Sequence, residues 1–157
     1  MNHLIRKITA TGVVTTFAGN GRGYFDFPNP LLTSFAIPES LPLTAQGNLL
    51  MADTGNGSIH QITPAGAVPT FAGTGGSDYA DGPAAMARFS SLTSLTQDAA
   101  GNLYVADTAN YRIRRVDTNG NVTTLAGSGV RGFLDGPAAT ARFFKCQDIA
   151  LDAADNL

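Results

Sequence analysis

Short segments rich in aliphatic and β-branched residues alternate with Gly, Asn, Asp and Pro along the whole chain. Such segments, bounded by turn residues, are typical of strands joined by hairpins. In residues 89–142 they lie near Leu92–Gln97, Asn102–Ala106, Arg112–Val116 and Val122–Ala126. The turn sequences Ala-Ala-Gly-Asn at 99–102 and Asp-Thr-Asn-Gly-Asn at 117–121 join them in pairs. We therefore predict a four-stranded antiparallel meander.

Hydrophobic and polar residues do not alternate strictly within these strands. The sequences Leu-Tyr-Val-Ala at 103–106 and Thr-Thr-Leu-Ala at 123–126 place hydrophobic or small residues on both faces. A sheet that buries both faces needs a neighbour on each side, so we expect the sheets to be stacked. Only residues 83–89 and 137–143 are expected to be locally helical, because each begins with a proline suited to a first turn.

The pattern repeats at a fixed period. Similar sequences begin at Ile5, Ile59 and Ile113, and the spacings are 59 − 5 = 54 and 113 − 59 = 54. The resulting units cover residues 1–34 (partial), 35–88, 89–142 and 143–157 (partial). Four-stranded sheets repeated around an axis are the blades of a β-propeller, so the fold class is predicted to be all-β, with about three blades per chain.

The net charge of the chain bears on which classes of partner to expect. The chain has 10 Lys and Arg against 12 Asp and Glu, a net charge of −2, which favours neither a nucleic acid nor a membrane partner. The basic pairs at 6–7 and 114–115 are therefore expected to be solvated strand faces. The chain shows no apolar run long enough to span a membrane and no signal-peptide core, and the sequence assigns no localisation. Cys146 is the single cysteine.

Three motifs carry a family resemblance. The sequences Ala-Asp-Thr-Gly-Asn at 52–56, Ala-Asp-Thr-Ala-Asn at 106–110 and Asn-His-Leu at 2–4 occur at matching places in the repeat. Together with the connector Asp-Gly-Pro-Ala-Ala-Thr-Ala-Arg-Phe at 135–143, they make the chain resemble the long bacterial type of NHL repeat. The resemblance covers essentially the whole chain. It implies a bacterial β-propeller, most often with six blades.

One chain is too short for a closed ring of four or more blades. The first residues enter at the third strand of a blade, and the last ones stop as a second strand begins. Two copies of the chain together supply almost the length that six repeat units need. We therefore expect a head-to-tail homodimer that closes one six-bladed ring. The alternative is a fragment of a longer propeller whose only activity is assembly.

A candidate ligand-binding face follows from propeller topology. The connectors between units lie on the same face as the links between second and third strands, and such loops are the usual binding surface. The side chains expected there are Arg22, Tyr24, Asp53, Tyr79, Asp107, Arg131 and Phe133. In the same connectors, Asp81 and Asp135 are expected to cap a short helix or to pair with Arg88 and Arg142.

No nucleophile and base stand together in the sequence, so we predict no catalytic residues, no metal ligands and no cofactor. The expected function is a noncatalytic scaffold that binds a peptide, a protein or a glycan as well as a second copy of itself. An enzyme remains the alternative, because the resemblance extends to lactonases and lyases that hold calcium or zinc in the central channel. Asp53 and Asp107 would then point into that channel.

Overall fold

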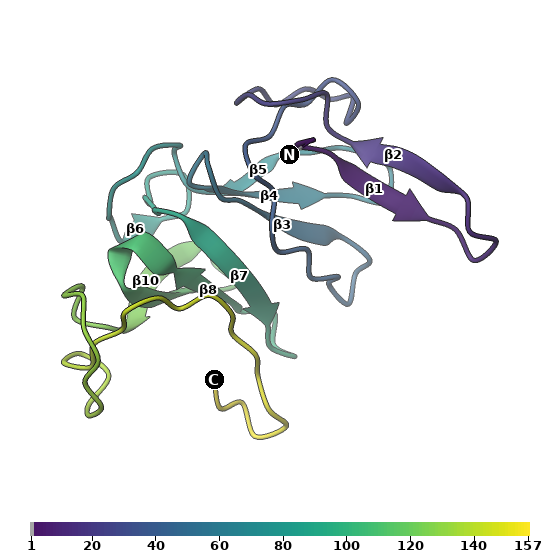
Figure 1. Ribbon diagram of the computed structural model, residues 1–157. Helices are drawn as coiled ribbons and strands as arrows, with labels where there is room; N and C mark the ends of the chain where they lie inside the picture. Colours follow the sequence, from purple (N-terminus) through teal and green to yellow (C-terminus); the bar gives the residue numbers. More distant parts are fainter. Residues whose placement is uncertain (1) are drawn as a thin grey trace.

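The structure is a computed structural model that describes residues 2–157, and it consists of three antiparallel sheets set side by side (Figure 1). The first sheet pairs β1 (Ile5–Ile8) with β2 (Val14–Ala18). The second contains β3 (Leu49–Asp53), β4 (Ser58–Ile62) and β5 (Thr70–Ala72). The third has the order β6-β10-β9-β8-β7, with β6 at Gly82–Pro83, β7 at Leu92–Gln97, β8 at Leu103–Asp107, β9 at Arg112–Val116 and β10 at Asn121–Ala126. The fold is all-β and propeller-like, and in the described residues the 3-10 turn η1 (Thr108–Asn110) is the sole helical element.

The meander predicted for residues 89–142 is confirmed by β7 to β10, which pair in sequence order. The turn between β9 and β10 shows why the chain reverses there. Gly120 has a φ of 78°, in the left-handed region that glycine adopts without steric cost. The Asp117 carboxylate accepts hydrogen bonds from the backbone N–H groups of Asn119 and Asn121, which closes the turn.

The helical turns expected after Pro83 and Pro137 do not become helices. Gly82 and Pro83 instead form β6, which pairs with Asn121 and Val122 at the start of β10. Only one hydrogen-bonded turn follows, because the N–H groups of Met86 and Ala87 both donate to the Pro83 carbonyl oxygen. The second connector therefore extends the outer edge of the next sheet instead of starting a helix.

The second sheet lacks a regular innermost strand. Residues 38–43 run beside β3 and exchange hydrogen bonds with Leu50 and Ala52, but they form isolated bridges only. Pro38 and Pro42 explain the irregularity, because proline has no N–H group to donate to a ladder. The four-strand plan is thus kept in outline at residues 35–88 and in full at residues 89–142.

Two hydrophobic cores hold the sheets together. One lies between the second and third sheets and includes Leu50, Ile59, Phe89 and Leu103. The other lies between the first and second sheets and includes Ile5, Phe35, Met51, Ile62 and Val68. The second sheet is buried on both faces, as the hydrophobic pattern predicts, because neighbouring residues such as Leu50 and Met51 enter opposite cores.

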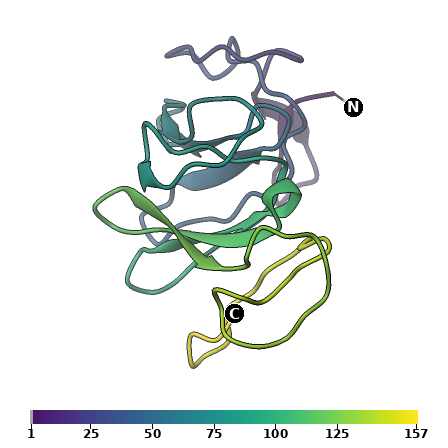
Figure 2. The same ribbon diagram turned by 90° about the vertical axis from the view of Figure 1, so that its left-hand side faces the viewer.

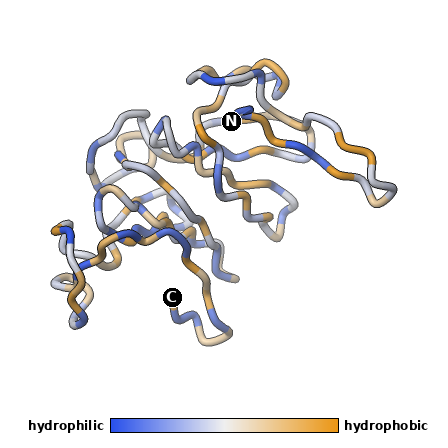
Figure 3. Tube along the Cα trace, viewed as in Figure 1, coloured by the Kyte–Doolittle hydropathy of each residue, from blue (hydrophilic) through white to orange (hydrophobic). Residues whose placement is uncertain are grey.

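The three sheets follow one another in chain order, and the segment after β10 lies at the far end from the first sheet (Figure 2). Hydrophobic residues recur along the strands of all three sheets, and further ones lie in the loops after β10 (Figure 3). Among residues 2–157 we find no helix with the length and apolar character needed to cross a membrane.

Candidate functional site

Arg114 on β9 is the centre of a polar cluster between the second connector and the third sheet. Its side chain is fully buried, so the expectation of a solvated strand face is wrong for this residue. All five of its N–H groups have acceptors. They are Asp107 Oδ2 at 2.8 Å, Asp81 Oδ1 at 2.5 and 3.1 Å, and the carbonyl oxygens of Ala80 and Arg88 at 2.7 and 3.2 Å. The connector is thereby fastened to the blade that follows it.

The Asp107 carboxylate is fully buried and belongs to the same cluster. It accepts hydrogen bonds from the Ser90 N–H at 2.8 Å and from the Asn110 amide at 2.9 Å, besides the bond from Arg114. Burial raises the pKa of Asp107, although these three donors act in the opposite direction. Asp107 therefore links the start of the innermost strand to the turn after β8.

Asp81 lies nearer the surface and has a different electrostatic environment. Burial acts to raise its pKa, but hydrogen bonding and charge from Arg114, with further bonds from Tyr79 and Thr124, outweigh burial and hold the pKa below the ordinary value. Asp81 is thus ionised at neutral pH and pairs with Arg114. The expected partner Arg88 instead pairs with the exposed Asp78, at 3.0 Å.

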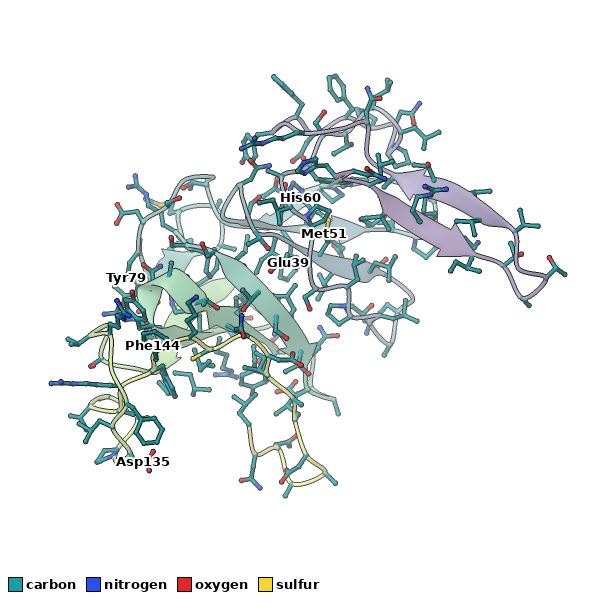
Figure 4. The ribbon with its side chains drawn as sticks, viewed as in Figure 1. Glu39, Met51, His60, Tyr79, Asp135 and Phe144 are labelled. Carbon is teal, nitrogen blue, oxygen red and sulfur yellow. The ribbon has the colours of Figure 1, made fainter. Side chains whose placement is uncertain are left out.

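Tyr79 covers this cluster from the connector, as its position beside the third sheet shows (Figure 4). Its ring lies under two guanidinium groups, 3.9 Å from that of Arg112 and 4.7 Å from that of Arg114. Its hydroxyl donates to Asp81 at 2.9 Å. The predicted ligand-face residue Tyr79 therefore seals a junction between blades while remaining partly exposed.

The first connector meets the second sheet through a related cluster in which His60 on β4 takes the place of arginine. His60 is buried, and its Nε2 atom lies 3.3 Å from Asp53 Oδ2 and 3.3 Å from Ser58 Oγ. Its Nδ1 atom lies 3.3 Å from Asp26 Oδ1. Its ring also packs edge-on against Phe35, with 5.6 Å between centroids.

Tyr24 of the first connector lies near the two carboxylates of this cluster. Burial, followed by the charges of Asp26 and Asp53, raises the pKa of Tyr24. Thr70 donates a hydrogen bond to Asp26. Asp26 follows Tyr24 by the same two positions that separate Asp81 from Tyr79, so this connector performs the same role with a register shifted by one position.

Two of the residues expected on the ligand face are therefore placed differently by the structure. Asp53 and Asp107 are fully buried, and their oxygens already accept hydrogen bonds from the Ala36 and Ser90 N–H groups, among other protein donors. These carboxylates do not fit the role of channel metal ligands. No group of three or more His, Cys, Asp or Glu side chains suited to a metal ion is found in residues 2–157.

Arg131 lines a hollow of about 460 Å³ between the third sheet and the segment after β10. The hollow combines two cationic groups, two aromatic rings and several polar groups. Its lining includes Ser91, Thr93, Thr108, Tyr111, Arg131, Phe144, Lys145 and Gln147. The Arg131 guanidinium stacks over the Phe144 ring at 4.4 Å, which holds one cation at the rim. This hollow is the candidate binding site.

The repeat explains which residues meet in this hollow. Lys145 stands 54 positions after Ser91, and Gln147 stands 54 positions after Thr93 (145 − 91 = 54 and 147 − 93 = 54). Equivalent positions of successive blades lie side by side in a propeller, so the hollow forms between the start of β7 and the equivalent segment at residues 145–147, which is not a regular strand. The 54-residue spacing therefore indicates from sequence alone that Lys145 and Gln147 lie beside Ser91 and Thr93. The predicted ligand face did not include these two residues.

The backbone around the hollow is fixed by the fold. Ser91 and Tyr111 have φ angles of 52° and 55°, in the left-handed region that residues other than glycine adopt only at a cost in free energy. The corresponding Ile37 and Gly57 in the preceding unit are also left-handed. The same backbone conformation therefore recurs at equivalent positions of the repeat, and it holds Ser91 and Tyr111 in fixed positions at the hollow.

Arg22 and Phe133 lie in other hollows of the same set of connectors. Arg22 is exposed and shares a hollow of about 640 Å³ with Asn2, His3 and Asn20. Phe133 is 88% exposed at the rim of a hollow of about 610 Å³ in the third connector. The predicted face thus divides into two buried carboxylates, two partly exposed tyrosines and three further residues in separate hollows.

Known structures share this architecture. A protein of unknown function from Bacteroides thetaiotaomicron is 27% identical, with a TM-score of 0.75 over 94% of this chain and 36% of its own. An auxiliary nutrient binding protein from the same organism is 19% identical, with a TM-score of 0.76 over 98% of this chain and 39% of its own. A virginiamycin B lyase from Staphylococcus aureus is 18% identical, with a TM-score of 0.51 over 79% of this chain and 34% of its own.

The chain therefore spans less than two fifths of the length of each of these structures. No family model matches the chain, and no curated protein matches it. At such low identity, the similarity to the nutrient binding protein and to the lyase establishes a common propeller-like fold among proteins of different activities.

Proposed function

We propose that this chain is a noncatalytic binding scaffold of the NHL-repeat type, which recognises an acidic, hydroxyl-rich ligand in the hollow at Arg131. Among peptide, protein and glycan ligands, an acidic glycan suits this chemistry best. Arg131 and Lys145 supply two positive charges, and Ser91, Tyr111 and Gln147 supply donors and acceptors for hydroxyl groups. The nutrient-binding activity named for one structural neighbour is consistent with this proposal.

One observation carries the proposal: cationic side chains from two different units converge on one rigid hollow. Arg131 comes from the third connector and is held against Phe144, whereas Lys145 follows in the next innermost segment. Polar groups fixed on a scaffold lose little entropy on binding, which favours affinity and specificity. Among the lining residues of the hollow no hydrogen bond joins a hydroxyl to a basic side chain, and the Thr93 and Thr108 hydroxyls bond each other and the Cys146 carbonyl oxygen, so we propose binding without chemistry.

Calorimetric titration tests this function. A uronic-acid disaccharide is added to the protein, and the neutral disaccharide of the same linkage serves as the ligand control. We expect binding of the acidic sugar only, with an affinity that falls about tenfold or more in Arg131→Ala and Lys145→Ala, because each loses a charge-assisted hydrogen bond. Arg88→Ala removes the same charge from an exposed position of the second connector and is the matched control. Equal affinities for the two sugars, or no loss in either variant, would contradict the proposal.

Association with a second copy is the other part of the proposed function. Three sheets stacked in sequence leave an open face at each end of the array, whereas closed propellers have no such ends. We propose that two chains associate head to tail into one six-bladed ring. Light scattering on a sizing column tests this association. A species of twice the 16.2 kDa chain mass supports the ring, and a 16.2 kDa species at all concentrations contradicts it.

A further inference from the structure

The first sheet exposes side chains whose counterparts in the other units are buried. Ile8 is 70% exposed, whereas the equivalent Ile62 and Val116 are each 1% exposed. The same holds for Arg6, an exposed residue whose equivalents His60 and Arg114 are buried. The free face of β1 and β2 therefore has the apolar and cationic surface that elsewhere packs against a preceding unit.

The third connector exposes the opposite set of side chains. Phe143 is partly exposed, whereas the equivalent Phe35 and Phe89 are fully buried. Phe133 is 88% exposed, whereas the equivalent Tyr79 lies under the guanidinium groups of the next blade. This connector thus presents the aromatic surface that, at the second connector, is covered by a strand of the following unit.

The charges of the two open faces are complementary. Asp135, at the position of Asp81, lies at the tip of the third connector (Figure 4). Arg6, at the position of Arg114, lies on β1 of the first sheet. At the complete junction Arg114 bonds Asp81 and lies over Tyr79 and Phe89, at 4.7 and 5.2 Å from the two rings.

We infer that the third connector is the docking site for the β1–β2 hairpin of a second copy. Arg6 of one copy bonds Asp135 of the other and lies over Phe133 and Phe143, as Arg114 bonds Asp81 and lies over Tyr79 and Phe89. This inference rests on the proposed association, and it specifies the residues that make it. A contact between two different patches is heterologous, so it joins copies head to tail.

The third connector is already shaped for this contact. The N–H groups of Gly127 and Ser128 bond the carbonyl oxygens of Ala138 and Ala141. The N–H groups of Gly73 and Thr74 bond Ala84 and Ala87 in the same way in the second connector. Leu134 and Arg142 are likewise bridged. A preformed loop has less conformational entropy to lose on binding, so the docking surface is ready before the partner arrives.

Charge reversal tests the inference through solution mass. Arg6→Asp and Asp135→Arg each place like charges together at every junction, and we expect either variant alone to raise the dimer dissociation constant about a hundredfold or more. When the two variants are mixed, a dimer of one copy of each has one junction with its two charges exchanged and one of the original kind. The mixture is therefore expected to recover the species of twice the chain mass.

Lys7→Asp is the matched control, because it makes the same charge change one position away. Lys7 corresponds to Arg115, whose guanidinium bonds Asn102 within its own sheet instead of a connector. Circular dichroism of each variant verifies that the fold is retained.

The outcomes separate this inference from the broader association. A wild-type chain that is monomeric at all concentrations overturns both. A wild-type dimer that neither variant weakens, or that Lys7→Asp weakens equally, overturns the docking mode and leaves association intact. Two weakened variants that do not recover on mixing also overturn the Arg6–Asp135 pairing. Sugar binding in the Arg131 hollow is measured separately, on the wild-type chain.

Discussion

The two complete junctions between connector and blade fulfil the same structural role with different chemistry. At the second connector, Arg114 bonds Asp81 and Asp107 and satisfies five donors. At the first, His60 approaches Asp26 and Asp53 at 3.3 Å, and in the described residues its Nδ1 atom has no hydrogen bond of good geometry. The arginine junction is closed and saturated, whereas the histidine junction is looser.

This difference indicates what the junction requires. A connector has to bring a carboxylate to a buried side chain of the following blade, and a bidentate guanidinium meets that requirement better than an imidazole. The aromatic neighbours Phe35 and Phe89 are buried equally well in both cases. Hydrophobic packing is therefore common to the junctions, and the polar side chain determines how firmly each connector is attached.

Removing the Arg114 side chain tests the difference between the two junctions with the largest expected effect. Arg114→Ala leaves the Asp107 carboxylate buried without its charged partner, and we expect the free energy of unfolding to fall by about 3–5 kcal/mol. Urea titration measures the loss. Arg115→Ala on the same strand is the control, with an expected cost of about 1 kcal/mol, because this residue loses one hydrogen bond, to Asn102. Equal losses would mean that the cluster has no special role.

The corresponding change at the histidine junction is expected to cost less. His60→Ala leaves Asp53 with its bonds from the Ala36 N–H and the Asn56 amide, so we expect a loss of about 1–3 kcal/mol. The same urea titration provides the value, and Gln61→Ala on β4 serves as its control. A loss larger than that of Arg114→Ala would reverse the ranking of the two junctions.

The pH dependence of stability distinguishes the two carboxylates of the arginine junction, and it is the smallest of the three expected effects. Because the pKa of Asp81 is lower in the folded chain, its contribution to stability is present above the ordinary carboxyl pKa of about 4 and is lost as the pH falls through the folded value. Asp107, whose pKa is raised by burial, contributes with the opposite sign.

Asp81→Asn is therefore expected to flatten the decline of stability between about pH 5 and pH 2, by less than about 1 kcal/mol because Asp81 is partly solvated. Melting temperatures across this range provide the measurement. Asp117→Asn removes a carboxylate whose pKa is also lowered, at an exposed turn outside the junction, and shows how much flattening such a group gives without Arg114. An unchanged slope in Asp81→Asn would contradict the assigned role of Asp81.

Local sequence was enough to predict the strands of the third sheet. Residues such as Val105 and Ile113 favour strands, and the glycine at 120 marks a turn that needs a positive φ. The prediction of helices was wrong. The sequence after Pro83 has helical propensity, but Gly82 and Pro83 pair with β10 and form a strand instead. Tertiary pairing outweighed a weak local preference.

The site was harder to predict, for a different reason. Arg114 stands beside Arg115 in the sequence, and nothing local distinguishes the buried arginine from the half-exposed one. Its partner Asp81 lies 33 residues earlier, on a connector, and Asp107 lies seven residues earlier, at the end of the neighbouring strand. Placing Asp107 on the ligand face followed from its loop position, and the fold instead turned its carboxylate toward a buried donor.

Each junction joins a connector carboxylate from one unit to a basic side chain, Arg114 or His60, from the next, so no unit contains both halves of its own junction. This offset has a consequence for how such chains lengthen. Duplicating a stretch one repeat period long places a new connector carboxylate opposite a new side chain at the position of Arg114 or His60, whatever the point at which the copied stretch begins. The gene can therefore gain a blade in one recombination event without first evolving a contact surface for it.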